Sequence, residues 1–128
     1  PPYDSDGGYI LEESADFGPD NALWRHGVLD SERFYSRNIS GAQRLSNGNT
    51  LICDGPHGRF FEVQDDGTMV WEYINPVINN GIVVQGESVP VTQNGQGNPV
   101  FRATRIEVNH PALSGRDLSS QGYIEGAP

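Results

Sequence analysis

The chain has one cysteine, Cys53, among its 128 residues. A single cysteine cannot form a disulfide within the chain, and it cannot build a cysteine metal cluster. Cys53 stands between Ile52 and Asp54 at the end of an apolar run. We therefore expect a buried, unreactive thiol rather than a nucleophile.

Lysine is absent, so all eight basic residues are arginine. The 17 Asp and Glu residues give a formal net charge of −9 and a sequence pI near 4.5. Phosphate backbones and anionic membranes bind mainly to cationic surfaces. This charge balance therefore argues against a nucleic-acid partner.

Long apolar runs are also lacking. No segment approaches the length of a transmembrane helix, and no charged-then-apolar signal segment opens the chain. A membrane span is therefore not expected. Residues 1–9 are typical of an interior cut rather than of a natural beginning, so we expect a mature product or a fragment.

The chain does contain four short apolar runs between Ser40 and Pro76, separated by turn residues. The runs are residues 42–45, 51–53, 60–63 and 69–74. Asn47-Gly48 and Asp66-Gly67 favour tight hairpins, because glycine readily adopts the positive φ that such turns need. We predict an all-β fold in which residues 40–76 form a four-stranded antiparallel meander. This is the size and shape of one β-propeller blade.

The segments before this meander are expected to belong to a preceding blade. Residues 1–39 are interpreted as a tail followed by outer strands, with a short strand candidate at Tyr9-Ile10-Leu11. The run around Trp24 resembles the run around Trp71, at about the spacing of one blade. Trp24 is therefore expected to close one blade as Trp71 closes the next.

The segments after the meander are less regular. Residues 77–98 are interpreted as an insertion with a candidate hairpin, in which residues 82–84 pair with residues 89–92 across Gly86. Residues 99–128 are expected to hold the first strand of a further blade, over residues 100–108, and then an irregular tail. No helix longer than a turn or two is expected.

Several motifs resemble one protein family. They read S-G-A-Q-R-L-x-N-G-N-T-L-I-C, G-R-F-F-E-V and D-G-x-x-V-W-E-Y-x-N-P, followed after residue 98 by P-V-F-R-A-T-R and L-S-G-R-D-L. In this order they resemble the arylsulfate sulfotransferase-like family of secreted β-propellers. The Asp-Gly-x-x-Val-Trp element alone occurs in other propellers, whereas the ordered combination is much more specific. The resemblance covers roughly half of the chain.

The resemblance implies a secreted protein, extracellular or periplasmic, in a closed ring of about six blades. This chain would supply part of the ring, and its partners would be other blades of the same or another chain. The implied activity moves a sulfuryl group from a phenolic sulfate to a phenol through a transiently sulfated histidine, without a cofactor. In the family histidines stand where blades begin, whereas Ser40-Gly41 occupies that position here.

Such chemistry needs a neutral imidazole, cationic groups for the sulfate oxygens, and a base for the acceptor hydroxyl. In a blade, the loop before the first strand and the loop between the second and third strands open on the same face. The expected anion site therefore combines Arg37, Ser40 and Arg59 with His57 as the catalytic candidate.

A simpler interpretation competes with this site. His57 lies in the tight turn Gly55-Pro56-His57-Gly58, where an exposed loop histidine without catalytic function is expected. In the same interpretation Arg59 pairs with Glu62 or Asp54 across the strand edge instead of holding a ligand.

Two further anion-binding candidates, Arg44 and Arg102, lie on predicted inner strands, from which long side chains can reach a central channel. Arg105 is an odd number of residues from Arg102, so the two face opposite sides of a regular strand. One of them is expected to pair with a carboxylate between blades. The three histidines lack metal-ligand spacing, so no metal site is expected.

Two functions remain open from the sequence. The first is a non-catalytic binding or structural module that keeps the propeller scaffold, and the alternative is an active sulfotransferase. A lone blade leaves its apolar faces unpaired, so we expect oligomeric assembly. The side chains expected to need covering by other blades are Leu51, Phe61, Val63 and Trp71.

Overall fold

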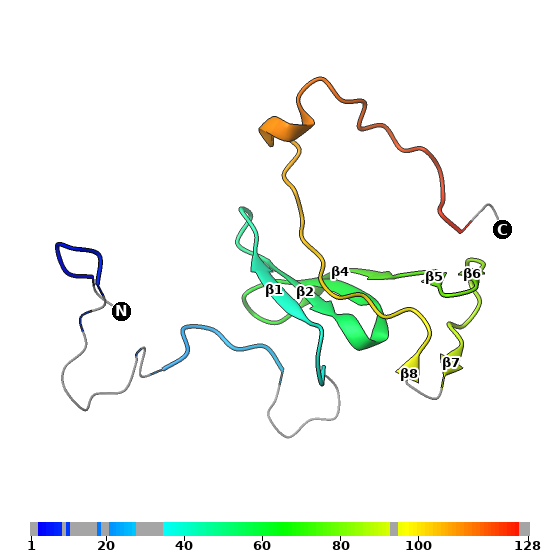
Figure 1. The fold of residues 1–128 in the computed structure, drawn as a ribbon, viewed down its shortest axis with the longest axis horizontal. Helices are drawn as coiled ribbons and strands as arrows, with labels where there is room; N and C mark the ends of the chain where they lie inside the picture. The colour runs from blue at the N-terminus through cyan, green and yellow to red at the C-terminus, as the bar shows by residue number, and fades with distance from the viewer. Residues whose placement is uncertain are drawn as a thin grey trace.

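The computed structural model describes residues 3–8, 10, 18, 21–27, 35–92 and 95–125. Its centre is a four-stranded antiparallel sheet whose strands follow one another in chain order (Figure 1). The strands are β1 (Gly41–Arg44), β2 (Thr50–Asp54), β3 (Arg59–Val63) and β4 (Met69–Ile74). Among the described residues the only helical turns are two short 3-10 segments, so the predicted all-β class and the meander are confirmed.

The two outer hairpins of the sheet use the same turn. Leu45 and Asn49 flank the first turn, and the Leu45 amide donates to the Asn49 carbonyl at 2.8 Å. Gln64 and Thr68 bracket the second with the equivalent bond at 2.9 Å. Gly48 and Gly67 both have φ of 86°, a left-handed conformation that glycine adopts without a steric penalty. The Asn-Gly and Asp-Gly signals therefore predicted these turns correctly.

The connection between β2 and β3 is a 3-10 turn, η1 (Gly55–His57), closed by a bond from the Gly58 amide to the Gly55 carbonyl. The Gly55 backbone lies in close contact with two other backbone segments. A Cβ at this position would overlap the carbonyl oxygens of Ile39 and Val100. The Val100 amide also donates to the Gly55 carbonyl at 2.9 Å. Glycine is therefore required here, because three chain segments meet at this end of the sheet.

One face of the sheet carries the apolar core. Ile52 is paired with Phe61, so both side chains point to the same face, where they cluster with Val63. Trp24 packs against this cluster, and its indole N–H donates to the Asp65 carbonyl at 2.9 Å. Trp24 therefore covers one face of the meander.

The other face is covered by the chain that follows residue 98, which passes over the sheet before it reaches η2 (Pro111–Leu113) (Figure 1). The Gln43 side chain bonds to both backbone groups of Arg105, donating to its carbonyl at 3.0 Å and accepting from its amide at 2.8 Å. The prediction of a strand over residues 100–108 is wrong, since the structure assigns none there. The Gln43 side-chain amide bonds to the backbone N–H and C=O of Arg105, the groups that a neighbouring strand would otherwise bond.

Residues 77–98 form two small hairpins instead of the predicted one. Strand β5 (Val77–Ile78) pairs with β6 (Gly81–Ile82), and β7 (Val91–Thr92) pairs with β8 (Gly95–Gln96). The predicted pairing across Gly86 is therefore wrong. Asn79-Asn80 provides a two-residue turn much closer to residues 81–82, and a short local hairpin closes a smaller loop.

The side chains become much less buried from β2 to β4. Every residue of β2 is buried, whereas all residues of β4 except Tyr73 are exposed. Leu51, Phe61 and Val63 are buried within this chain, contrary to the expectation that other blades must cover them. Trp71 does remain 41% exposed. Tyr9, Leu11 and Phe34, where outer strands of a preceding blade were expected, lie outside the described residues.

Candidate functional site

The start of β1 and the η1 turn lie at the same end of the sheet. Gly41 is in register with Cys53, and the Gly55 backbone lies against Ile39. The Arg102 side chain reaches the same end, because its Cγ lies 3.8 Å from the position of a Cβ on Gly41. The structure therefore brings the region of Ser40, the His57 turn and Arg102 to one end of the meander.

His57 is oriented by a carboxylate that the sequence reasoning did not assign to it. Its Nδ1 lies 2.9 Å from both carboxylate oxygens of Asp54. The Asp54 side chain is 7% exposed and the His57 side chain is 48% exposed. A carboxylate at Nδ1 fixes the ring and leaves Nε2 as the second nitrogen of the imidazole. The spacing Asp-Gly-Pro-His across a glycine turn is the sequence signal that would have found this pair.

Arg59 does not join this pair. Its Nε donates to Glu72 Oε1 at 2.5 Å, and its guanidinium lies 4.5 Å from the centre of the Phe61 ring. The expected partners of Arg59, Glu62 and Asp54, are therefore wrong. Asp54 is already held by His57, and Glu62 lies on the opposite face of the strand that Arg59 begins.

Arg44 lies at the other end of the sheet from His57. Its Nη1 donates to Asp65 at 2.9 Å and to the Gly48 carbonyl at 2.7 Å. Its guanidinium also lies 5.0 Å from the Trp24 ring centre. Arg44 therefore connects the two hairpin turns and Trp24, and it does not take part in an anion site with His57.

The remaining predicted site residues are on the surface. Arg37, Ser40 and Arg102 are exposed. Ser40 lines a cavity of about 420 Å³ together with Ser36, Trp24 and His26, between the N-terminal segment and β1. Arg105 is half-buried and packs against the sheet, whereas Arg102 is exposed. The expectation that the two face opposite sides of a strand is wrong, because residues 100–108 form no strand.

The most completely bonded polar group is the buried carboxylate of Glu62, whose side chain is 6% exposed. Its Oε1 accepts from Asn47 at 3.0 Å and from Asn49 at 2.7 Å, and its Oε2 accepts from Arg105 Nη1 at 2.8 Å. These bonds, led by those from the two asparagines, lower the pKa of Glu62 below its ordinary 4.5. Of the two arginines expected to include a partner for a carboxylate, Arg105 has one, Glu62 on the sheet that its segment crosses.

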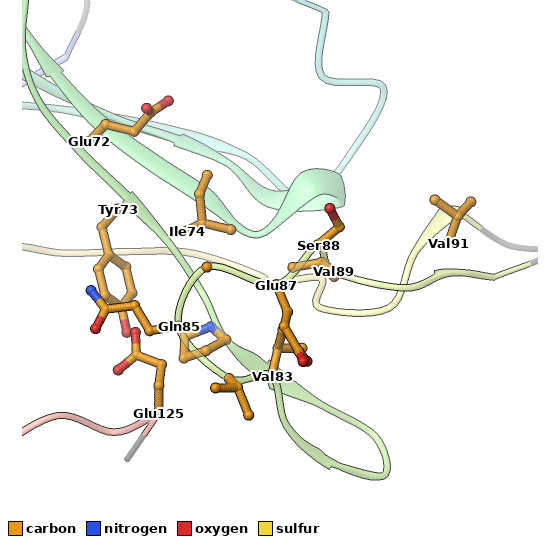
Figure 2. Close-up of a pocket in the computed structure, with 13 residues that line it drawn as sticks. Glu72, Tyr73, Ile74, Val83, Gln85, Glu87, Ser88, Val89, Val91 and Glu125 are labelled. Carbon is orange, nitrogen blue, oxygen red and sulfur yellow. The ribbon is translucent and has the colours of Figure 1, made fainter. Parts of the chain in front are cut away.

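A larger cavity, of about 710 Å³, lies beside β4 (Figure 2). In this close-up Tyr73, Gln85 and Glu125 gather at one end of the cavity, and Val91 lies at the other. Burial, with a smaller effect of the Glu125 carboxylate, raises the pKa of the Tyr73 hydroxyl. Sequence reasoning did not predict this cavity, because its wall is formed by the irregular chain between β6 and β7.

Cys53 is not a candidate nucleophile. It is 1% exposed, and burial raises the pKa of its thiol above the usual value, which disfavours the reactive thiolate. Within the described ranges, no group of three or more His, Cys, Asp and Glu side chains is placed to hold a metal ion. The same part of the chain has no helix with the length and apolar character needed to cross a membrane.

Comparison with protein-family models matches no family, and comparisons with curated proteins and with solved structures find no similar chain.

The Glu62 network gives a prediction for pH dependence. A carboxylate whose pKa is lower in the folded state stabilises the fold above its unfolded pKa and loses this contribution as pH falls through the folded pKa. Glu62→Gln should lower the free energy of unfolding at pH 7 by about 1.5–3 kcal/mol, the usual worth of a hydrogen bond to a charged group. Urea unfolding at a series of pH values measures this difference, which should shrink below pH 4.5.

Glu87→Gln is the matched control, because Glu87 is exposed and forms no ion pair with a described residue. It removes the same charge and should change stability little at any pH. Two results would contradict a stabilising role of the ionised Glu62 carboxylate. One is a loss of unfolding free energy in Glu62→Gln that stays constant down to pH 3, and the other is a loss equal to that in Glu87→Gln.

Proposed function

We propose that this chain is a blade-type binding or structural module of the arylsulfate sulfotransferase-like family of secreted β-propellers, and that it is not catalytic on its own. The motifs that carry the resemblance support this proposal, since they coincide with the strands of the meander. G-A-Q-R forms β1, R-F-F-E-V forms β3 and M-V-W-E-Y-I forms β4. A sheet of this order is the unit from which propellers are built.

Apolar side chains exposed on both faces of β4 and in the residues after it are the observation that carries the proposal. Seven large apolar side chains in this region are between 41% and 50% exposed: Met69, Val70, Trp71, Ile74, Val77, Ile82 and Val84. A concentration of exposed apolar side chains marks a surface that is covered by a partner. The partner that fits is another blade-type sheet, from the same or another chain.

The pairing of three predicted cations within the fold supports a module without catalytic activity. Sulfate oxygens require guanidinium groups that are available to the ligand. Arg44 is bonded to Asp65, Arg59 to Glu72 and Arg105 to Glu62. Each of these three guanidinium groups therefore has a carboxylate partner in the fold, and none of them contacts His57.

Self-association or assembly through the β4 surface tests the proposal. Size-exclusion chromatography with light scattering should show association that weakens on dilution. Met69→Ser with Val70→Ser should reduce it, because both side chains are 47% exposed on β4. Ile106→Ser with Val108→Ser is the control, since these exposed side chains lie outside the sheet.

His57→Ala should leave the association unchanged, because His57 lies in the η1 turn and not on β4. A compact monomer at all concentrations that also fails to bind other blade-type sheets would contradict the proposal.

A second candidate function, sulfuryl transfer through His57, is favoured by the Asp54–His57 pair. In this reaction Nε2 attacks the sulfur of a phenolic sulfate, an N–S bond forms, and the S–O bond to the departing phenolate breaks. The acceptor phenol then attacks the sulfur and forms an S–O bond, its proton passes to solvent, and the N–S bond breaks to restore the neutral imidazole. Asp54 would hold the ring and stabilise its positive charge.

Incubation with 4-nitrophenyl sulfate and a phenol tests this second function. Release of nitrophenolate, sulfation of the phenol, and a sulfuryl group on His57 by peptide mass spectrometry are the expected results. His57→Ala should abolish all three, whereas His110→Ala, which alters an exposed histidine outside the sheet, should not. Absence of both transfer and sulfated His57 would remove this function.

A further inference from the structure

The 710 Å³ cavity lies along the free edge of the sheet rather than on one of its faces. Three consecutive residues of β4, Glu72, Tyr73 and Ile74, line it. Successive side chains of a strand point to opposite faces, so one cavity can contact all three only where it borders the strand edge. β4 is the last strand of the sheet, so among the described segments this edge has no neighbouring strand.

The hydrogen-bond register shows which backbone groups face the cavity. The Asn75 amide donates to the Gly58 carbonyl at 2.8 Å, so Asn75 and Gly58 form a hydrogen-bonded pair. These pairs alternate along an antiparallel ladder. The N–H and C=O groups of Glu72 and Ile74 therefore point away from β3. In the described part of the chain, no other backbone segment bonds to them.

The remaining walls combine apolar floor residues with carboxylates. Pro76 and Val83 are buried, and Val89 is half-buried, which gives the cavity an apolar floor. Glu87 and Glu125 line the same cavity and form no ion pair with a described residue (Figure 2). None of the described lining residues is basic.

We propose that this cavity is a groove for an extended polypeptide segment that adds to β4 as a fifth strand. Its backbone would bond to Glu72 and Ile74, with apolar side chains on the floor and basic side chains facing Glu87 and Glu125. Charge complementarity selects the occupant. A second copy of this chain is disfavoured, because it carries a net charge of −9 and no lysine. The groove is independent of whether the sheet is a propeller blade, since it uses the edge of β4 and not its packed faces.

Peptide binding tests the groove. The probe is a fluorescein-labelled, end-capped peptide of alternating arginine and valine, of about eight residues, the length of an ordinary strand. Fluorescence anisotropy should show saturable one-to-one binding that weakens with salt. The same peptide methylated on alternate backbone nitrogens should bind at least about tenfold more weakly, because it cannot pair with the strand edge. A peptide with aspartate in place of arginine should not bind.

Amide hydrogen exchange locates the bound peptide. The amides of Glu72 and Ile74 should become protected on binding. The amides of Trp71 and Tyr73, which already face β3, should change little and serve as internal controls. Protection elsewhere without protection of Glu72 and Ile74 would overturn the proposal.

The carboxylates are tested by a matched pair of variants. Glu87→Gln with Glu125→Gln should weaken binding about fivefold, in keeping with two exposed ion pairs. Asp6→Asn with Asp117→Asn removes the same charge from exposed sites that do not line the groove and should leave affinity unchanged. Equal binding of the methylated peptide, equal effects of both double variants, or no binding would each overturn the proposal. Ile74 and Val84 belong both to the exposed apolar set and to the groove, whereas Met69 and Val70 do not line the groove. The variant with Met69→Ser and Val70→Ser should therefore keep its peptide binding even where its association is reduced.

Discussion

The buried carboxylate of Glu62 is the interaction on which the arrangement of the chain depends. It lies on β3, yet its bonds go to the β1–β2 turn through Asn47 and Asn49 and to the returning segment through Arg105. A buried charge without partners is costly, so the three donors and the carboxylate stabilise one another only when all are in place. Arg105 also lies 5.0 Å from the Trp71 ring centre, which extends the network to β4.

A single sheet with one crossing segment on each face explains both the core and the exposed surfaces. Trp24 covers Ile52, Phe61 and Val63 on one face, and the segment around Arg105 covers the other. These segments cover the middle strands of the sheet more completely than its last strand. This coverage accounts for the burial of β2 and the exposure of β4. Large apolar side chains remain exposed on β4 and in the chain that follows it, and also at Phe101, Val108 and Tyr123.

The sequence predicted what local chemistry determines. Glycine after asparagine or aspartate placed two hairpin turns correctly, and short apolar runs between turn residues placed the four strands. It failed where a distant contact decides the outcome. Residues 100–108 have the pattern of a strand, but the side chain of Gln43 occupies the backbone groups of Arg105. The Asp54–His57 pair and the Glu62 network were missed for the same reason, because strand register and folding of the chain over the sheet select the partners of each carboxylate.

A double-mutant cycle between Glu62 and Arg105 tests the central claim most directly. Glu62→Gln, Arg105→Gln and the double variant would each be unfolded in urea at pH 7. If the two side chains act in one bonded network, the sum of the stability losses in the two single variants should exceed the loss in the double variant by about 1–3 kcal/mol. Losses that add within about 0.5 kcal/mol would show that the two side chains contribute independently and would contradict it.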